Sequence, residues 1–467
     1  MNRNTTTPST QKVRRDVRGG KRGQGHRFQR ERRRVRRADP RSIRVTSGER
    51  SLTSCAGLVE FGCFLRDQGI DRELAERFGH LKVGPQVVYP MAAQLRLLMD
   101  LHCAGEGRVF GLEALAHDPL FFRLAGGSVP CIDTVYTDLE RFGEPEIAAL
   151  EELSAEDVLA RLRAAKPRIL HLDIDTTVAV LFGIQEGALP GPNPRYHGRP
   201  SYHPMLMRVA EVQGICGAQL RPGNTAFGHE DVPTVVQWLR RVREAVGPHC
   251  LIRVRMDAAG DCTALLHELE GLGVHYYIKA KISQDLAWAI GNHRAWTTVD
   301  HDADGKATRQ VAQVIFSRNE WTKAGIGPRV VAVRSTERDN GKQIALWADL
   351  DYTVQCYLTN DRDSEIDDVS RIYDDRAGIE PIIGELKAEW CIGKAPSAVF
   401  AANHAAFLIK ILSYNLYRHF LAQHYPALAH WRTGWARRVT ILRPGRLVRS
   451  GRRVALHTTG IRLPMLR

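Results

Sequence analysis

The sequence predicts an α/β protein in which a helical region precedes a mixed β-sheet and helices return near the C-terminus. Apolar residues recur every three to four positions between about 50 and 165. From 168 to 280, apolar β-rich runs alternate with helical segments, and a long apolar helical pattern spans 397–421. The 467 residues suffice for about three domains of ordinary size.

The net charge of +14 is concentrated at the two ends of the chain. Residues 1–44 hold 16 Lys and Arg against three acids, and residues 431–467 hold ten Arg and no acid, so the remainder carries −9. Basic segments of this kind neutralise phosphates and release counterions, which predicts a polyanion partner. Residues 1–44 also lack periodicity, which predicts a disordered arm. A simple solvated tail is the alternative for that arm.

Cysteine usage and hydropathy predict a cytoplasmic protein without a membrane span. The nine Cys form no C-x-x-C pair, and an odd number fits reduced thiols better than a disulfide framework. The apolar pattern at 397–421 contains Asn403, His404 and Lys410, so it predicts a buried helix of a soluble domain. The Arg-rich N-terminus lacks the apolar stretch of a signal peptide.

The first folded part, residues 45–165, is predicted to be helical. Within it, residues 129–143 (VPCIDTVYTDLERFG) outline a turn, an N-cap at Asp133 and a short helix, as in the second helix of a helix-turn-helix. An ordinary structural helix is the alternative for this segment.

The next part begins with an apolar run, 168–183, that contains two aspartates. The order of elements up to residue 280 is βββαβαβ, which brings the first strand beside the end of the fourth. Asp173 or Asp175 would then lie near Asp257, and since residues 173 and 175 share a face, spacing does not choose between them. We favour Asp175, which two Thr follow. Clustered carboxylates repel unless they are protonated or neutralised by a cation, whereas a single buried Asp is more often a cap or an ion pair.

A second set of polar residues lies in 371–390, where Tyr373, Arg376, Glu380 and Lys387 form one stripe if the segment is a continuous helix. Pro381 disfavours helical geometry at the preceding residue, so the helix would start or kink there. A solvated helix face is the alternative interpretation.

Together these residues resemble the insertion-sequence DDE transposases of DDE domain group 1, whose catalytic helix bears a Tyr-(2)-Arg-(3)-Glu-(6)-Lys signature. The resemblance covers roughly residues 50–460. It implies an α/β fold with a ribonuclease-H-like catalytic core interrupted by a β-rich insertion, a helical N-terminal domain and basic termini. Four further segments carry it: LDIDTTVAVLFGIQEGA (172–188), HGRPSYHPML (197–206), LRPGNT (220–225) and VRMDAAGD (254–261).

The resemblance also implies the roles of the acidic residues. Asp175, Asp257 and Glu380 would be the catalytic residues and would bind two divalent ions, Mg²⁺ with Mn²⁺ as a substitute. Asp173 is the alternative to Asp175. The implied activity is two-metal phosphoryl transfer, which cleaves DNA at the element ends and transfers the 3′-OH strand to target DNA.

The implied partners are double-stranded DNA with terminal inverted repeats, target DNA and a second copy of the chain, in the bacterial cytoplasm at the nucleoid. Tyr373, Arg376 and Lys387 would hold a phosphate of the element end. Trp296, Trp321 and Trp347 of the insertion are candidates to stack a displaced base, although a Trp in a β-rich region is usually core. A nuclease without strand transfer and a catalytically silent DNA-binding protein remain alternatives.

These considerations predict six segments along the chain. They are a disordered basic arm (1–44), a helical DNA-end-binding and dimerisation domain (45–165), the first part of the catalytic core (166–280), a β-rich insertion (281–370), the catalytic helix with the C-terminal helices of the core (371–425) and a basic C-terminal segment (426–467).

Overall fold

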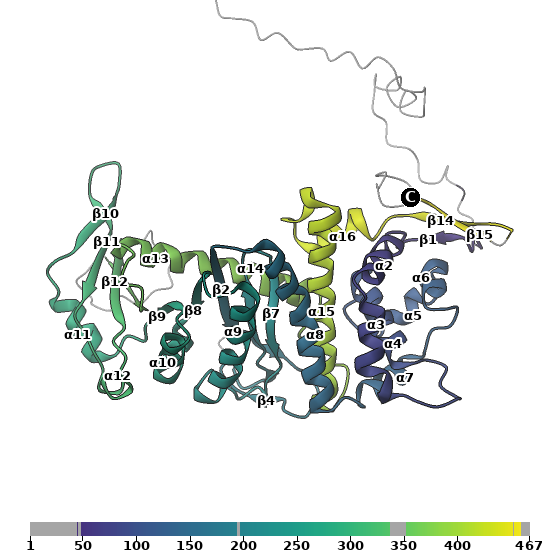
Figure 1. Ribbon diagram of the computed structural model, residues 1–467, viewed down its shortest axis with the longest axis horizontal. Coiled ribbons are helices and arrows are strands. Elements are labelled where there is room, and N and C mark those ends of the chain that lie inside the picture. The colour runs from purple at the N-terminus through teal and green to yellow at the C-terminus, as the bar shows by residue number, and fades with distance from the viewer. Residues whose placement is uncertain (1–43, 45–47, 194–196, 337–351, 452, 459–467) are drawn as a thin grey trace, which may run out of the picture. The chain divides into compact units, whose positions relative to one another are not determined.

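The computed structural model describes residues 44, 48–193, 197–336, 352–451 and 453–458 (Figure 1). The chain divides into two compact units, Met1–Arg50 and Ser51–Arg467. Nearly all of the predicted arm, residues 1–44, lies outside the described residues. The architecture below is that of the second unit.

A nine-stranded mixed sheet is the largest feature of this unit, with strand order β10-β11-β12-β13-β9-β8-β2-β6-β7. Strands β2, β6 and β7 form an antiparallel meander, whereas β8 and β9 run parallel to β2. The order of elements agrees with the βββαβαβ pattern expected from the sequence. The elements are β2 (Ile169–Thr176), β6 (Met205–Val209), β7 (Gly214–Gln219), α9 (Val232–Val246), β8 (Leu251–Met256), α10 (Thr263–Gly271) and β9 (His275–Lys279).

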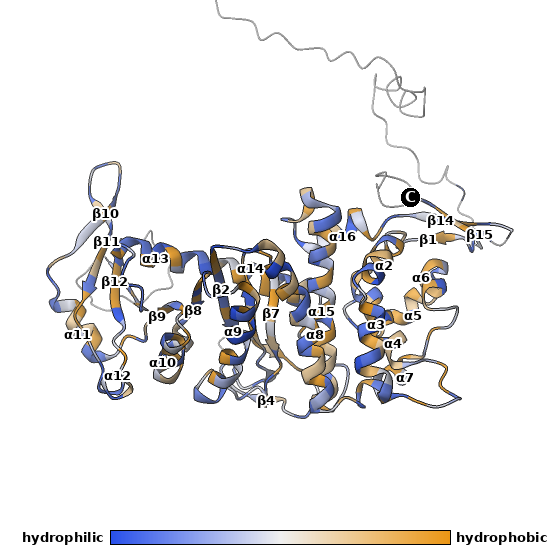
Figure 2. Ribbon diagram, in the orientation of Figure 1, coloured by the Kyte–Doolittle hydropathy of each residue, from blue (hydrophilic) through white to orange (hydrophobic). Residues whose placement is uncertain are grey.

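Helix α9 shows why these segments pack as they do. Its apolar side chains recur at helical spacing and face the sheet, whereas Arg240 points to solvent, and Figure 2 shows a hydrophilic outer side on α9 beside the apolar strand β7. Gly217 of β7 permits the close approach of Trp238, because a Cβ there would lie 2.2 Å from the indole.

The loop after β2 folds into a small three-stranded sheet of order β3-β5-β4. It packs against the LRPGNT segment, where Gly223 lies so close to neighbouring backbone that a Cβ would meet the carbonyl oxygen of Ser201 at 2.0 Å. This segment therefore has a packing role. The three strands are β3 (Ala179–Val180), β4 (Leu189–Pro190) and β5 (Pro200–Tyr202).

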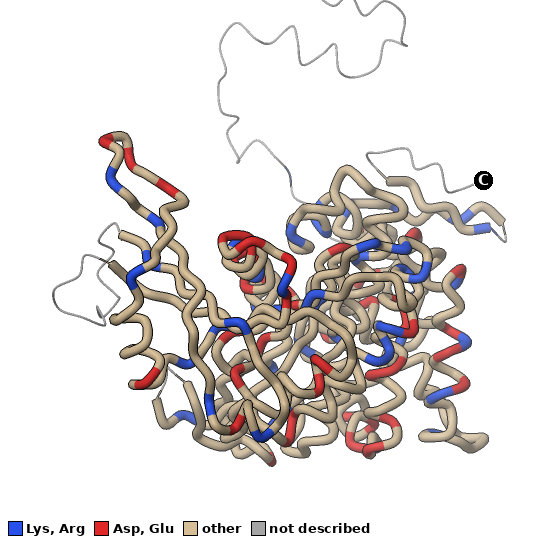
Figure 3. Tube along the Cα trace, turned by 60° about the vertical axis from the view of Figure 1, so that its left-hand side comes forward, with Lys and Arg blue, Asp and Glu red and all other residues tan. Residues whose placement is uncertain are grey.

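The expected β-rich insertion extends the same sheet. Strand β13 pairs with β9, so the antiparallel strands β10 to β13 continue the core sheet, with Tyr357 opposite Lys279. The long β10–β11 hairpin carries acidic residues at its tip (Figure 3). Residues 337–351 of the expected insertion lie outside the described residues. The elements are α11 (Gln284–Asn292), β10 (Thr297–His301), β11 (Ala307–Val314), α12 (Asn319–Ala324), β12 (Arg329–Ser335) and β13 (Thr353–Thr359).

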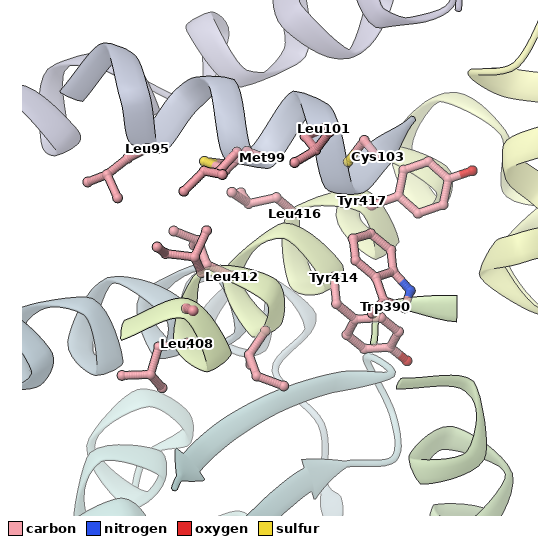
Figure 4. Packing of buried hydrophobic residues seen from close by; sticks show 14 of the residues in the cluster. Leu95, Met99, Leu101, Cys103, Trp390, Leu408, Leu412, Tyr414, Leu416 and Tyr417 are labelled. Carbon is pink, nitrogen blue, oxygen red and sulfur yellow. The ribbon is translucent and has the colours of Figure 1, made fainter. Parts of the chain in front are cut away.

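The N-terminal region is helical, as expected, but its helices share one apolar core with the C-terminal helix α15 (Phe400–His424). Leu95 and Met99 of α4 lie opposite Leu412 and Leu416 of α15 (Figure 4). The helices are α2 (Leu58–Asp67), α3 (Ile70–Phe78), α4 (Met91–Cys103), α5 (Gly111–Leu115), α6 (Pro119–Leu124), α7 (Ile132–Leu139) and α8 (Glu144–Ala165).

The expected N-cap at Asp133 is wrong. Cys131 occupies the N-cap position of α7, and Asp133 lies in the first turn, where its negative charge favours the helix N-terminus.

The C-terminal segment pairs with the start of the unit. Strand β14 lies between β15 and β1, with Arg446 opposite Leu52. The remaining elements are β1 (Leu52–Thr53), α13 (Ile366–Asp374), α14 (Ile379–Glu389), α16 (Thr433–Thr440), β14 (Gly445–Ser450) and β15 (Arg453–Thr458).

Helix α15 covers the edge strand β7 and completes its hydrogen bonding. The Asn415 Oδ1 accepts the backbone N–H of Ile215 at 2.9 Å, and its Nδ2 donates to the Ile215 carbonyl at 2.8 Å and to the Ser154 carbonyl at 3.0 Å. One buried amide therefore takes the place of a neighbouring strand at this edge. Among the helices that the structure describes, none is both long and apolar enough to cross a membrane.

We predict that Asn415→Ala lowers the free energy of unfolding by about 2–3 kcal/mol, because it leaves buried backbone groups of β7 without partners. Urea denaturation followed by circular dichroism measures the change. Asn292→Ala, at an exposed position on α11, is the matched control. Equal stability of the two variants would contradict the role given to Asn415.

Candidate active site

Two aspartates lie next to each other at the carboxyl ends of two adjacent parallel strands, β2 and β8. The β2–β8 ladder ends at the pair Ile174 and Met256, so Asp175 and Asp257 come next on strands about 4.8 Å apart. The Asp257 carboxylate accepts the backbone N–H of Ala259 at 3.0 Å and caps a short 3-10 turn, Ala258–Gly260. This hydrogen bond holds one carboxylate oxygen in place.

The electrostatics show that these carboxylates act on each other. The pKa of Asp175 is raised to about 6, first by burial and then by the charges of Asp257 and Glu380, against the lowering effect of the nearby Arg376 guanidinium. Three carboxylates thus share one guanidinium, that of Arg376, in this site.

The polar stripe expected on one helix is divided among three elements. Tyr373 lies on α13, Arg376 on a 3-10 turn (Asp375–Gly378), and Glu380 and Lys387 on α14. Pro381 is the third residue of α14, where the missing N–H would have no intrahelical partner and the ring is tolerated. Pro381 therefore lies in the first turn of a new helix, which is one of the two outcomes expected from the sequence.

Arg376 lies between two of the candidate acids. Its side chain is buried, with Nη2 at 3.0 Å from Asp175 Oδ1 and Nη1 at 3.9 Å from Glu380 Oε1. The Glu380 side chain is 69% exposed. Glu380 therefore stands at the solvent side of the site, linked to Asp175 through the guanidinium.

Asp173 has different surroundings from Asp175, although both lie on one face of β2. Asp173 is fully buried and lies directly opposite Arg208 on β6 and Arg255 on β8. Its carboxylate accepts from Arg208 Nη1 at 2.9 Å and from Arg255 Nε at 2.6 Å. Both of its oxygens are thus occupied by cations of neighbouring strands.

These two arginines also contact the segment that carries Arg376 and Glu380. Arg255 Nη1 donates to the carbonyl of Ile372 at 3.1 Å, and the Arg208 guanidinium packs against Gly378, where a Cβ would lie 3.1 Å from Nη1. Neither residue was predicted from the sequence as part of the site. Each of the two neighbouring strands contains arginine in an otherwise apolar run, and this signal becomes informative only once the strand register is known.

The candidate DNA-binding residues are placed differently from one another. Tyr373 is buried and packs on Tyr357 with ring centroids 4.6 Å apart, and burial raises its pKa to about 12, so the hydroxyl stays protonated at neutral pH. Lys387 is exposed on α14. Burial lowers the pKa of His203, and the charges of Arg221 and Lys387 add to this effect, so the charge of Lys387 acts on the loop before β6.

The tryptophans of the insertion differ in exposure. Trp321 is fully buried and belongs to the core, whereas Trp296 is partly buried and lies under the Arg334 guanidinium, 4.3 Å from Cζ to the ring centroid. Trp347 lies outside the described residues. Trp288 on α11, which the sequence analysis did not single out, is an exposed ring in this region.

The acids are candidates for a metal site, and their donor groups lie in the part of the chain that the structure describes. In that part of the chain, no three His, Cys, Asp or Glu side chains come together closely enough to hold a metal ion. Asp175 and Asp257 supply hard oxygen donors with excess negative charge, which suits Mg²⁺. The third candidate, Glu380, is turned toward Arg376 and solvent.

The family model described as "Transposase DDE domain group 1" matches residues 35–461. The chain belongs to this transposase family. No protein of curated function matches the chain significantly. The match covers the helical region, the sheet with its extension and the C-terminal helices.

Among solved structures, the chain is similar to a piggyBac transposase in a synaptic complex with hairpin DNA, with 12% identity and a TM-score of 0.41 over 84% of this chain and 81% of that chain. It is also similar to the Mos1 transposase in a paired-end complex with the left transposon end. That similarity has 15% identity and a TM-score of 0.17 over 42% of this chain and 60% of that chain.

We predict that Asp173→Asn lowers the free energy of unfolding by roughly 3–5 kcal/mol, because it leaves two buried arginines without their shared carboxylate. Chemical denaturation measures the loss. Asp304→Asn at the exposed hairpin tip is the control and should leave stability unchanged. A similar stability for both variants would show that Asp173 does not hold these elements together.

Asp175 predicts a pH dependence of stability. Its pKa is about 6 in the folded protein against about 3.9 in an unfolded chain, so the folded state holds the proton more tightly. Ionisation of Asp175 therefore reduces wild-type stability as pH rises from about 4 to about 6. Relative to wild type, Asp175→Asn should gain stability across this range and show a constant difference above it. Melting curves in EDTA measure this, and parallel wild-type and variant profiles would contradict the placement of Asp175.

Proposed function

We propose that this chain is an active DDE transposase, which cleaves DNA at the ends of its element and joins the freed 3′-OH to target DNA. The observation that carries the proposal is the meeting of Asp175 and Asp257 on adjacent strands, with the segment of Arg376 and Glu380 docked against them. The family supports the reaction class, and the arrangement of these residues supports this location for it.

The sheet supports a ribonuclease-H-like catalytic core within this fold. The order β7-β6-β2-β8-β9 combines an antiparallel meander with two parallel strands joined by α9 and α10. In open sheets of this kind, functional residues lie beyond the carboxyl ends of the parallel strands. Asp175 and Asp257 lie at that edge.

Asp175, Asp257 and Glu380 are the residues that would hold divalent ions, Mg²⁺ or Mn²⁺. When bound, such ions activate the attacking water or 3′-hydroxyl and stabilise the charge on the scissile phosphate. The excess negative charge at Asp175 and Asp257 supports this assignment. Glu380, in the first turn of α14, is the outer ligand of the proposed set. Its long side chain is largely exposed to solvent.

Other residues of the chain would bind and orient the DNA. Arg376 and Lys387 supply cations for a phosphate of the element end, and the protonated Tyr373 hydroxyl is a neutral donor. The C-terminal hairpin adds the exposed Arg449 and Arg453, so it is a second place where DNA phosphates would bind. The proposed partners are DNA with terminal inverted repeats, target DNA and a second copy of the chain, one for each element end.

A specific observation favours a second candidate function. The ion pair of Arg376 with Asp175 and the exposure of Glu380 would suit a DNA-binding protein of this family that no longer cleaves. In that case the chain would recognise the element ends and leave them intact.

One assay separates these functions. The protein is incubated with Mg²⁺, a target plasmid and linear DNA that carries the inverted repeats flanking its gene. Joined products support the transposase. Cleavage without joining indicates a nuclease, and a mobility shift without cleavage indicates the silent binder.

We predict that Asp257→Ala abolishes cleavage and leaves end binding within about twofold of wild type, because the change removes a carboxylate and no DNA-binding cation. Gel assays with labelled ends measure both properties. Asp304→Ala at the hairpin tip should cleave like wild type. Undiminished cleavage by Asp257→Ala would reject the assignment of the acidic site.

A further inference from the structure

A cavity of about 450 Å³ lies beside the elements that carry the candidate acids. Its walls come from helices α4, α7 and α15, from the turn Gly107–Phe110 after α4, from the segment Val180–Gln185 after β2, and from the turn Gly393–Pro396 between α14 and α15. A volume of this size is within the range of small-ligand sites. The transposase chemistry proposed above makes no use of it.

The cavity gathers positive charge. Lys410 of α15 is 4% exposed, and its Nζ donates to the carbonyls of Cys391 at 2.8 Å and Lys394 at 3.1 Å. Burial, together with the charges of Lys394 and Arg108, lowers the pKa of Lys410 to about 8, so these three cations share one region. Lys410 is still mostly protonated at neutral pH. Among the described residues that line the cavity, none is acidic.

A buried histidine supplies a further polar atom at this place. His102 is 4% exposed, and its Nδ1 has no hydrogen-bond partner within the described residues. Burial lowers the pKa of His102 well below its usual value, and the charges of Lys410 and Arg437 lower it as well. The ring is therefore neutral at physiological pH. A neutral imidazole with an unpaired nitrogen can donate to or accept from a ligand. Buried polar atoms without a partner are rare in folded proteins.

Aromatic rings surround the opening. Phe182 is 80% exposed, Phe110 is also exposed, and Tyr136 forms part of the wall. The Arg199 guanidinium lies over the Phe182 ring, 5.5 Å from Cζ to the centroid. Exposed rings beside a cationic, partly apolar cavity match a ligand with a flat aromatic part and an anionic group. A nucleotide has this composition.

Chain connectivity places the cavity close to the candidate acids. Val180 follows Asp175 by five residues, which limits their separation to about 18 Å for an extended chain. The turn after α14 contacts the same loop, since a Cβ at Gly393 would lie 3.3 Å from the Ala179 Cβ. This limit corresponds to about five base pairs of duplex at 3.4 Å per pair. A strand held at Asp175 and Asp257 is therefore within reach of the cavity.

We propose that this cavity binds one unpaired nucleotide of the DNA, with its base against Phe182 and Phe110 and its phosphate near Lys394 and Arg108. The choice of DNA as the source of the nucleotide rests on the proposed function, whereas the preference for a nucleotide rests on the cavity itself. A free nucleotide shares the same chemistry, so the experiment compares the two sources.

Fluorescence anisotropy tests the proposal with two labelled duplexes that differ only by one unpaired nucleotide, in EDTA so that cleavage does not interfere. Wild type should bind the bulged duplex about tenfold more tightly than the paired one, since stacking of a base on an aromatic ring stabilises binding to this extent. Phe182→Ala and Lys394→Gln should each remove most of this preference while binding the paired duplex like wild type. Both positions are exposed, so the fold tolerates the changes.

Two controls and a second arm decide between the outcomes. Phe122→Ala and Lys323→Gln, at positions outside the cavity lining, should retain the full preference. Titration with thymidine 5′-monophosphate forms the second arm. Tight binding of the free nucleotide, lost in Phe182→Ala, together with no bulge preference would overturn the assignment to DNA. An unchanged bulge preference in both cavity variants would overturn the site.

These results are independent of the transposition assay. Loss of the bulge preference with intact end cleavage rejects the cavity alone. Absence of cleavage with a bulge preference that depends on Phe182 rejects the catalytic proposal alone.

Discussion

The carboxylate of Asp173 is fully buried between Arg208 and Arg255, and these two side chains also contact the segment from Ile372 to Gly378. Removal of this carboxylate would leave two buried cations unpaired, which costs far more than an exposed ion pair contributes. The network therefore determines how the helical segment docks on the sheet. The positions of Arg376 and Glu380 relative to Asp175 depend on that docking.

Two aspartates on one face of a strand thus have different properties because their neighbours differ. Asp173 is paired with cations on both sides, whereas Asp175 is next to Asp257 and shares a single guanidinium with Glu380. A buried carboxylate that is fully paired with cations, such as Asp173, stabilises the fold. A carboxylate in a region of excess negative charge can bind an added cation, which is the basis of the proposed chemistry.

The order of the core elements and the proximity of Asp175 and Asp257 could be predicted from the sequence, since parallel strands in that order align their carboxyl ends. The choice between Asp173 and Asp175 could not be predicted, because both side chains lie on the same face of β2. Only the strand register shows that Arg208 and Arg255 lie opposite Asp173. Periodicity reports local structure, so it did not show that β13 would pair with β9 or that α4 and α15 would share a core. The break between α13 and α14 was only partly evident, through Pro381.

We expect Asp175 and Asp257 together to bind a divalent cation when the chain holds DNA. Anomalous scattering from crystals of the DNA complex grown with Mn²⁺ measures this directly. We predict a manganese peak in contact with both carboxylates. Ordered carboxylates without a peak between them, or manganese bound only elsewhere in the chain, would contradict it.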